Sequence, residues 1–129
     1  MDGGNQQLGA GALAGRRVLV VEDDWLVANE TAQLLESVGV VVVGPAPDVE
    51  RARALLQASA IDAALIDINL NGVVSFEIAD LLLQRGVKFA FMTGYTREVL
   101  PRRFADTPMH EKPFDPRRAL TELLLSADA

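Results

Sequence analysis

Short, continuous apolar runs alternate along the chain with longer stretches in which apolar residues recur every three or four positions. Continuous runs of about four to eight residues, rich in β-branched side chains and bounded by polar or Gly/Pro residues, are typical of strands buried on both faces in a parallel sheet. We therefore expect a parallel sheet. The predicted strands are Arg17–Glu22, Val40–Val43, Ala63–Asp67, Val87–Thr93 and Pro108–Glu111.

The stretches between these runs predict helices with recognisable starts and ends. The first helix begins at Asp23 or Asp24, where an acid favours a helix N-terminus, and it stops at Gly39. Asp48 and Asp115 begin the second and the last helix. Further expectations are a third helix that ends at Gly86, a short helix from about Thr96 to Phe104 weakened by Pro101, and inward faces formed by Val27, Leu34 and Val38, by Val49, Ala52 and Leu56, by Phe76, Ala79 and Leu83, and by Leu120, Leu123 and Leu124.

Five strands alternating with five helices predict a single α/β domain, doubly wound, with helices on both faces of the sheet and right-handed crossovers. We expect this domain to span residues 16–127. Residues 1–15 hold five of the ten glycines and carry no charge after Asp2. They bury too little apolar surface to offset the entropy of ordering. We therefore expect a flexible tail, in which Leu8–Leu13 could form a short apolar turn.

Composition narrows the class of function. The chain has 129 residues, no cysteine and a formal net charge of -6, which fits one domain and excludes disulfides, thiol nucleophiles and Cys-ligated zinc. The negative charge argues against a nucleic-acid partner. No apolar stretch reaches the ~18 residues that cross a bilayer, and no secretion signal is recognisable. We expect a cytoplasmic protein with no membrane partner.

Acidic and amide side chains follow two of the predicted strands. Glu22, Asp23 and Asp24 follow the first strand, and Asp67 and Asn69 follow the third. In a parallel sheet the carboxyl ends of the strands lie at one edge. Converging carboxylates repel one another unless a cation joins them. Oxygen ligands without histidine or cysteine suit a hard cation, which favours Mg²⁺, with Mn²⁺ or Ca²⁺ as alternatives.

Thr93 and Lys112 follow the fourth and fifth predicted strands. A threonine hydroxyl can donate a hydrogen bond to a phosphoryl oxygen, and a lysine can neutralise another. Asp67 is then left as a nucleophile, since carboxylates form aspartyl phosphates. Phosphoryl transfer needs mainly positioning and charge neutralisation. Each residue alone has an ordinary structural explanation, but their joint occurrence at the strand ends predicts phosphoryl chemistry.

The arrangement resembles the receiver domain of two-component response regulators over about residues 16–127. The matching motifs are Val20-Val-Glu-Asp-Asp24, the run that ends in Asp67, Thr93 at the end of the fourth strand, and Lys112-Pro-Phe114. The resemblance implies a flavodoxin-like (βα)5 fold with a five-stranded parallel sheet in the order 2-1-3-4-5. It also implies that the protein is a phosphoacceptor switch, not an enzyme in the usual sense, although it promotes its own phosphorylation and dephosphorylation.

The roles of matching residues in that family carry over as expectations. They are Asp67 as phosphoacceptor and metal ligand, Glu22 and Asp23 as the metal-site acids, Asn69 as a ligand through its backbone carbonyl, Thr93 as the switch hydroxyl, Lys112 as the partner of the phosphoryl group, and a cis peptide bond between Lys112 and Pro113.

The chain departs from the family's common pattern at Met109, at Asn71 and at Gly94-Tyr95, which follow Thr93. Met109 stands at the switch position that usually holds Tyr or Phe, and Asn71 stands where a proline is common. Phe91-Met-Thr-Gly-Tyr95 resembles stand-alone receivers with Phe-x-Thr-Gly-Tyr, several of which act in α-proteobacterial stress or cell-cycle phosphorelays. Because methionine cannot donate a hydrogen bond, we hypothesise that Tyr95 reports the switch or shields the phosphoryl group. The alternative is an ordinary packing or surface tyrosine.

The resemblance implies a histidine kinase or histidine phosphotransfer protein as phosphodonor. It also implies a downstream protein partner on the face formed by helix 4, strand 5 and helix 5, and we expect no output domain in this chain. Trp25 is expected to be half-buried beside the site and to report Mg²⁺ by its fluorescence. His110 is expected to be a partly exposed edge residue. We expect five arginines around the partner face, where they either favour an acidic partner or simply form a solvated surface. They are Arg97, Arg102, Arg103, Arg117 and Arg118.

Three other functions compete with this interpretation. A pseudo-receiver that only acts as an interaction scaffold is the main alternative, but the intact Asp67, Thr93 and Lys112 argue against it. A flavodoxin-like cofactor binder would hold phosphate after the first strand, where Glu22 and its acidic neighbours repel it. A phosphatase with an aspartate nucleophile would want an acid two residues later, where this chain has Asn69.

Overall fold

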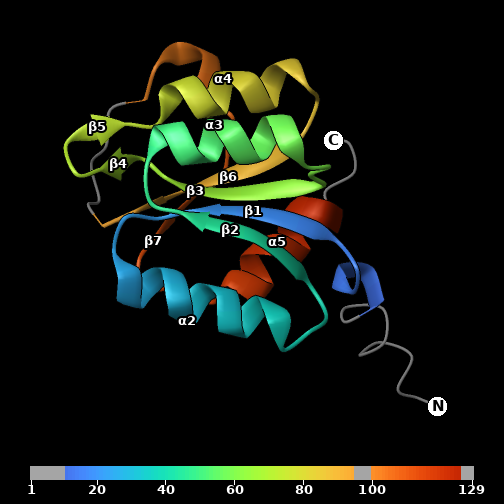
Figure 1. Cartoon of the computed structure of the whole chain (residues 1–129). Helices are drawn as coiled ribbons and strands as arrows, with labels where there is room; N and C mark the ends of the chain where they lie inside the picture. The colour runs from blue at the N-terminus through green and yellow to red at the C-terminus, as the bar shows by residue number, and fades with distance from the viewer. Residues whose placement is uncertain (1–10, 95–99, 126–129) are drawn as a thin grey trace.

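The computed structural model describes residues 11–94 and 100–125. A 5-stranded parallel sheet lies at its centre, in the order β2-β1-β3-β6-β7, and confirms the predicted sheet and strand order (Figure 1). The strands are β1 (Arg17–Val21), β2 (Val41–Ala46), β3 (Ala63–Asp67), β6 (Lys88–Thr93) and β7 (Met109–Glu111), and the helices are α2 (Trp25–Glu36), α3 (Val49–Ala58), α4 (Phe76–Gln84) and α5 (Pro116–Leu125).

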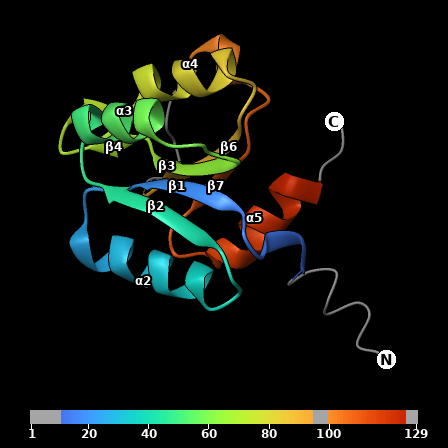
Figure 2. The ribbon, with the colours of Figure 1, turned by 45° about the vertical axis from the view of Figure 1, so that its right-hand side comes forward.

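Helices cover both faces of the sheet. Figure 2 shows α3 and α4 on one face and α2 and α5 on the other. Successive residues of a strand point to opposite faces, and β1 follows this rule. Leu19 and Val21 enter the core cluster under α3 and α4. Val18 and Val20 enter the cluster under α2 and α5. The sheet is therefore apolar on both sides, and polar side chains gather at its carboxyl edge.

Two helices bury a different set of residues from the one predicted. In α2 the buried positions are Ala28, Thr31, Ala32 and Leu35, whereas Val27, Leu34 and Val38 are only half-buried. In α4, Leu82 is fully buried and Leu83 is 46% exposed. Runs such as Leu81-Leu82-Leu83 fit more than one helical face, so their periodicity does not decide which leucine points inward.

A small hairpin after β3 was not predicted. Its strands are β4 (Asn69–Leu70) and β5 (Val73–Val74), which pair antiparallel. The two residues between them have positive φ angles, 54° at Asn71 and 88° at Gly72. This is the geometry of a type I′ turn, for which Asn-Gly is the preferred sequence. The strand β2 also continues through Gly44 to Ala46, with an irregular register against β1.

The predicted short helix from Thr96 to Phe104 is wrong where the structure describes it. Residues 95–99 lie outside the described part, Leu100 and Pro101 are not helical, and only Arg102–Phe104 form a 3₁₀ turn, η1. Pro101 has a ψ of 151°, which is extended backbone. A proline restricts the residue before it to extended conformations, so a helix cannot run easily through this position.

Part of the predicted tail belongs to the folded domain. Residues 11–13 are helical, and Leu13 is 2% exposed within the core cluster under α2 and α5. The backbone N–H of Gly15 donates to the carbonyl of Gly39 at 2.8 Å. Leu13 therefore anchors the segment that the glycine content had suggested to be free. Residues 1–10 lie outside the described part. Among the described residues, no helix is long and apolar enough to cross a membrane.

Replacing the Leu13 anchor should destabilise the domain. We expect Leu13→Ala to lower the free energy of unfolding by about 2–4 kcal/mol, because it leaves a cavity in the core. The control is Leu83→Ala, which changes a leucine that is 46% exposed and should cost less than about 1 kcal/mol. Urea denaturation followed by circular dichroism measures both, and equal losses would contradict the anchoring role.

Candidate functional site

The carboxyl edge of the sheet brings together acids from two strands. Glu22 and Asp23 follow β1, and Asp67 ends β3. Each of the three offers a carboxylate oxygen, and these oxygens lie within 4.8 Å of one another. The neighbouring Asp24 has another task, since it caps α2 by accepting hydrogen bonds from the backbone N–H groups of Leu26 and Val27. The structure thus separates a helix cap from a cluster of three acids.

Glu22 is the most deeply buried member of the cluster, at 1% exposure. Its carboxylate accepts the backbone N–H of Asp24 at 3.0 Å and the Lys112 ammonium at 2.8 Å. Burial raises the pKa of Glu22 from 4.5 to about 7, and the nearby charge of Asp67 acts in the same direction, while the bond from Lys112 partly offsets the rise. Such a carboxyl gains by sharing its charge with a cation.

Lys112 joins two acids of the cluster. Its ammonium lies 2.8 Å from a carboxylate oxygen of Glu22 and 2.8 Å from one of Asp67. Burial acts to lower the pKa of Lys112, but the hydrogen bonds to Asp67 and Glu22 outweigh burial and raise it above its usual value. The backbone holds the residue in place, because its N–H donates to the Thr93 carbonyl at 2.7 Å, and its peptide bond to Pro113 is cis.

The loop after Asp67 is bonded to the cluster at several points. The N–H of Asn69 donates to the Asp67 carboxylate at 3.2 Å, and the N–H of Asn71 donates to the Asp23 carboxylate at 3.0 Å. The side-chain oxygen of Asn69 accepts the N–H of Gly72 at 2.7 Å. Asn71 was noted in the sequence only as a departure from proline. Its N–H, which a proline lacks, is what ties the hairpin to Asp23.

Ser75 is a further site residue that the sequence analysis missed. It is fully buried, and its hydroxyl donates to the backbone carbonyl of Asp67 at 2.6 Å. Its position eight residues after Asp67 gives no local signal of this contact. Only the Asn71-Gly72 hairpin signal, which returns the chain toward β3, could have indicated it.

Two of the predicted switch residues, Thr93 and Met109, lie on neighbouring strands at positions that do not face each other. Thr93 ends β6 and is buried beside the cluster, where β6 meets β7. Met109 lies at the start of β7 opposite Phe91 and is 39% exposed. Tyr95 lies outside the described residues, so its proposed roles remain predictions.

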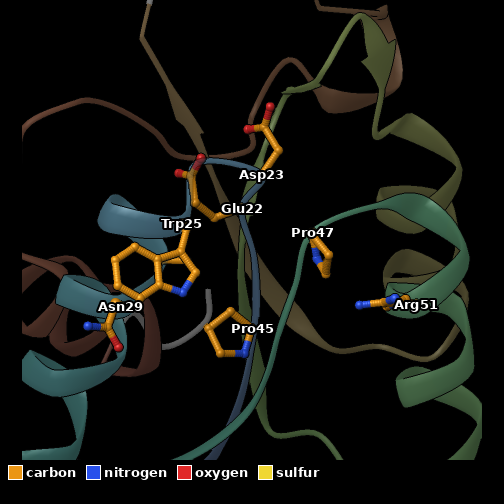
Figure 3. Close-up of a pocket in the computed structure, with 8 residues that line it drawn as sticks. Glu22, Asp23, Trp25, Asn29, Pro45, Pro47 and Arg51 are labelled. Carbon is orange, nitrogen blue, oxygen red and sulfur yellow. The ribbon is translucent and has the colours of Figure 1, made fainter.

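A pocket of about 320 Å³ opens beside the acids. Figure 3 shows Glu22 and Asp23 at one end, Trp25 on the side of α2, and Pro45 and Pro47 along the opposite wall. Trp25 is 75% exposed, so the expected half-burial is wrong. Trp25 is the first residue of α2, and because helix side chains lean toward the N-terminus, its ring has no preceding helical turn to pack on.

Four of the other side chains singled out in the sequence, His110 and three arginines, have structural partners. His110 stacks on Phe114 with ring centroids 5.2 Å apart, at the edge of the sheet. Among the arginines of the predicted partner face, three bind acids of this chain. These pairs are Arg103 with Asp80, Arg117 with Asp115, and Arg118 with Glu122, and Arg97 lies outside the described residues.

The donor set suits a hard divalent cation. Three carboxylates face one another, and no histidine or cysteine accompanies them among the described residues. Carboxylate and carbonyl oxygens are the ligands of Mg²⁺, Mn²⁺ and Ca²⁺. Burial raises the pKa of Glu22 in spite of the hydrogen bond from Lys112, and a further cation next to this carboxylate would stabilise its ionised form.

Known proteins are similar to this chain in sequence and in fold. Residues 18–124 match the response regulator receiver domain. The chain is 34% identical over 111 residues to the sensory transduction protein LytT of Bacillus cereus, a match that covers 83% of this chain and 45% of LytT. The chain thus spans less than half the length of that relative.

Solved structures agree. The solution structure of SdrG from Sphingomonas melonis Fr1 is 34% identical with a TM-score of 0.73, over 88% of this chain and 94% of SdrG. SdrG has also been solved in a BeF3-activated conformation, with 34% identity, a TM-score of 0.73, and coverage of 87% of this chain and 98% of that one. The PhyR receiver domain of Erythrobacter litoralis is 25% identical with a TM-score of 0.75, over 92% and 97% of the two chains. This chain belongs to the family of response regulator receiver domains.

Proposed function

We propose that this receiver domain accepts a phosphoryl group on Asp67 with the help of Mg²⁺, and that a partner protein reads the modified state. The observation that carries the proposal is the cluster of three carboxylates within 4.8 Å of one another, with Lys112 bonded to two of them. The activated conformation of SdrG, a 34% identical relative solved with BeF3, supports it. Mn²⁺ is the alternative metal.

Glu22, Asp23 and Asp67 would hold the ion, together with the backbone carbonyl of Asn69. The hairpin geometry supports Asn69 in this role. Ser75 donates its N–H to the carbonyl of Ile68, so Asn69 lies between hydrogen-bonded pairs of the antiparallel ladder, and its own N–H and C=O face away from Val74. The N–H donates to the Asp67 carboxylate, and because the N–H and C=O of a strand residue point to the same side, this bond supports the proposed role of the Asn69 carbonyl.

In the proposed transfer, an oxygen of Asp67 forms a bond to phosphorus as the bond to the donor's leaving group breaks. The leaving group is an imidazole nitrogen in a phosphohistidine, or an acetate oxygen in acetyl phosphate. Bound Mg²⁺ supplies positive charge to the phosphoryl oxygens. Lys112 neutralises a further oxygen, and the Thr93 hydroxyl donates a hydrogen bond to another. Positioning and charge neutralisation suffice for this reaction.

The proposed donor is a histidine kinase or a histidine phosphotransfer protein, and the proposed output is binding to a downstream protein through the face around β7 and α5. Arg103, Arg117 and Arg118 are paired with acids of this chain, so their charge is partly satisfied before any partner binds. The expected attraction to an acidic partner is correspondingly weaker. The alternative is a scaffold that is never phosphorylated. The first experiment below distinguishes the two functions.

Phosphorylation of Asp67 is the first testable prediction. With acetyl phosphate and Mg²⁺, we expect intact mass spectrometry to show a gain of one phosphoryl group, which is lost in Asp67→Asn and after removal of Mg²⁺ with a chelator. The matched control is Asp62→Asn, because Asp62 lies just before β3, at the opposite end of that strand from Asp67, and an asparagine oxygen can still accept the N–H of Arg17. A mass gain that survives Asp67→Asn would contradict the proposal.

Binding of Mg²⁺ should depend on pH. Since the pKa of Glu22 is raised to about 7, its carboxyl is protonated below that pH in the metal-free protein and must lose its proton to bind the ion. Affinity therefore rises as the pH increases and levels off above about 7; one pH unit below this value it should be about ten-fold weaker. Isothermal titration calorimetry across this range measures the effect. A pH profile unchanged by Glu22→Gln would show that another group is responsible.

Removal of the Lys112 charge should destabilise the metal-free protein. We expect Lys112→Met to lower the free energy of unfolding by about 3 kcal/mol, because two buried carboxylates lose their cation. Mg²⁺ should restore most of this loss in Lys112→Met. The control is Lys88→Met. Lys88 is an exposed lysine at the first position of β6, whereas the site lies at the end of that strand. Thermal unfolding with and without Mg²⁺ tests this, and a loss that Mg²⁺ leaves unchanged would contradict the shared site.

A further inference from the structure

Ser75 occupies the residue before α4, a position where serine usually caps a helix. In this protein its side chain makes no cap hydrogen bond to α4. The residue is 0% exposed, and its hydroxyl instead donates to the backbone carbonyl of Asp67 at 2.6 Å. A fully buried hydroxyl is thus directed away from the helix that it precedes and toward the predicted phosphoacceptor.

This bond closes the base of the hairpin behind Asp67. The N–H of Ser75 also donates to the carbonyl of Ile68 at 2.9 Å, so one residue binds two consecutive carbonyls of the chain that leaves β3. The N–H of Ile68 in turn donates to the carbonyl of Met92 at 3.0 Å. The start of the loop is therefore held between β6 on one side and Ser75 on the other.

The two hydrogen bonds from Ser75 also determine where the rest of the loop lies. Asn69 follows directly and directs its N–H to the carboxylate of Asp67, and the N–H of Asn71 reaches the carboxylate of Asp23. Two acids from different strands thus accept hydrogen bonds from one short hairpin. If its base shifted, the spacing of both carboxylates and the direction of the Asn69 carbonyl would shift with it.

We propose that Ser75 is a positioning residue of the phosphorylation site, which fixes the Asp67–Gly72 loop in the geometry that binds the divalent cation. The inference rests on the proposed function for the chemistry that Ser75 assists. Its structural part, the fixing of the loop, can be tested on the metal-free protein alone. Because the hydroxyl makes no cap bond, removing it affects the loop without removing a cap of α4.

The test compares Ser75→Ala with Ile78→Val. Ile78 lies one turn later in α4, is fully buried, and loses one methylene-sized group in the variant, so this control destabilises the same helix without touching Asp67. In Ser75→Ala we expect the dissociation constant for Mg²⁺, measured by calorimetry, to rise roughly 3- to 10-fold, the range of one buried hydrogen bond. The phosphorylation rate with acetyl phosphate at saturating Mg²⁺ should change less than the Mg²⁺ constant does.

Hydrogen exchange of the metal-free protein provides the independent measurement. The amides of Asn69, Asn71 and Gly72 should exchange faster in Ser75→Ala and at the native rate in Ile78→Val. Unchanged exchange, or a Mg²⁺ affinity equal to that of Ile78→Val, would overturn the positioning role. If the unmodified protein itself takes no phosphoryl group, the proposed function fails, while the exchange and Mg²⁺ measurements still decide the role of Ser75.

Discussion

The central constraint in this structure is that Glu22 and Asp67, two buried carboxylates, share the ammonium of Lys112 at 2.8 Å each. Buried charges of like sign are tolerated only when a cation compensates them. The parallel sheet makes the arrangement possible, because the carboxyl ends of β1, β3 and β7 lie at one edge. Packing of the apolar strands thus fixes the acids close together, and the charge of Lys112 compensates them so that they can remain buried.

Burial raises the pKa of Glu22 although Lys112 and the N–H of Asp24 donate hydrogen bonds to its carboxylate. Lys112 therefore offsets only part of the cost of burying this charge. A further cation next to Glu22 would stabilise its ionised form. The phosphoryl group that we propose for Asp67 would add negative charge to the same edge, so it would require both Lys112 and the divalent cation.

Much of the fold follows from the sequence because buried parallel strands are continuous apolar runs, as at Ala63–Asp67. The site residues at the strand ends follow from the same pattern. Helix faces were less predictable, since Leu82 and Leu83 are chemically equal and only packing against the sheet distinguishes them. The Asn71-Gly72 turn carried a clear hairpin signal that the polar composition of the loop obscured. The contact of Ser75 with Asp67 depends on tertiary closure, which no local pattern encodes.

The backbone around Lys112 indicates how a change at Asp67 can reach the surface. Lys112 follows β7, an edge strand of 3 residues that pairs with β6 alone. Its N–H donates to the carbonyl of Thr93, so one backbone hydrogen bond joins Lys112 to the last residue of β6. Met109, at the other end of β7, has a flexible thioether side chain that cannot donate a hydrogen bond to this region. The proposed phosphorylation of Asp67 would therefore act on β7 through the side chain of Lys112 and its backbone bond to Thr93, so the edge strand is the element that we expect to transmit the change.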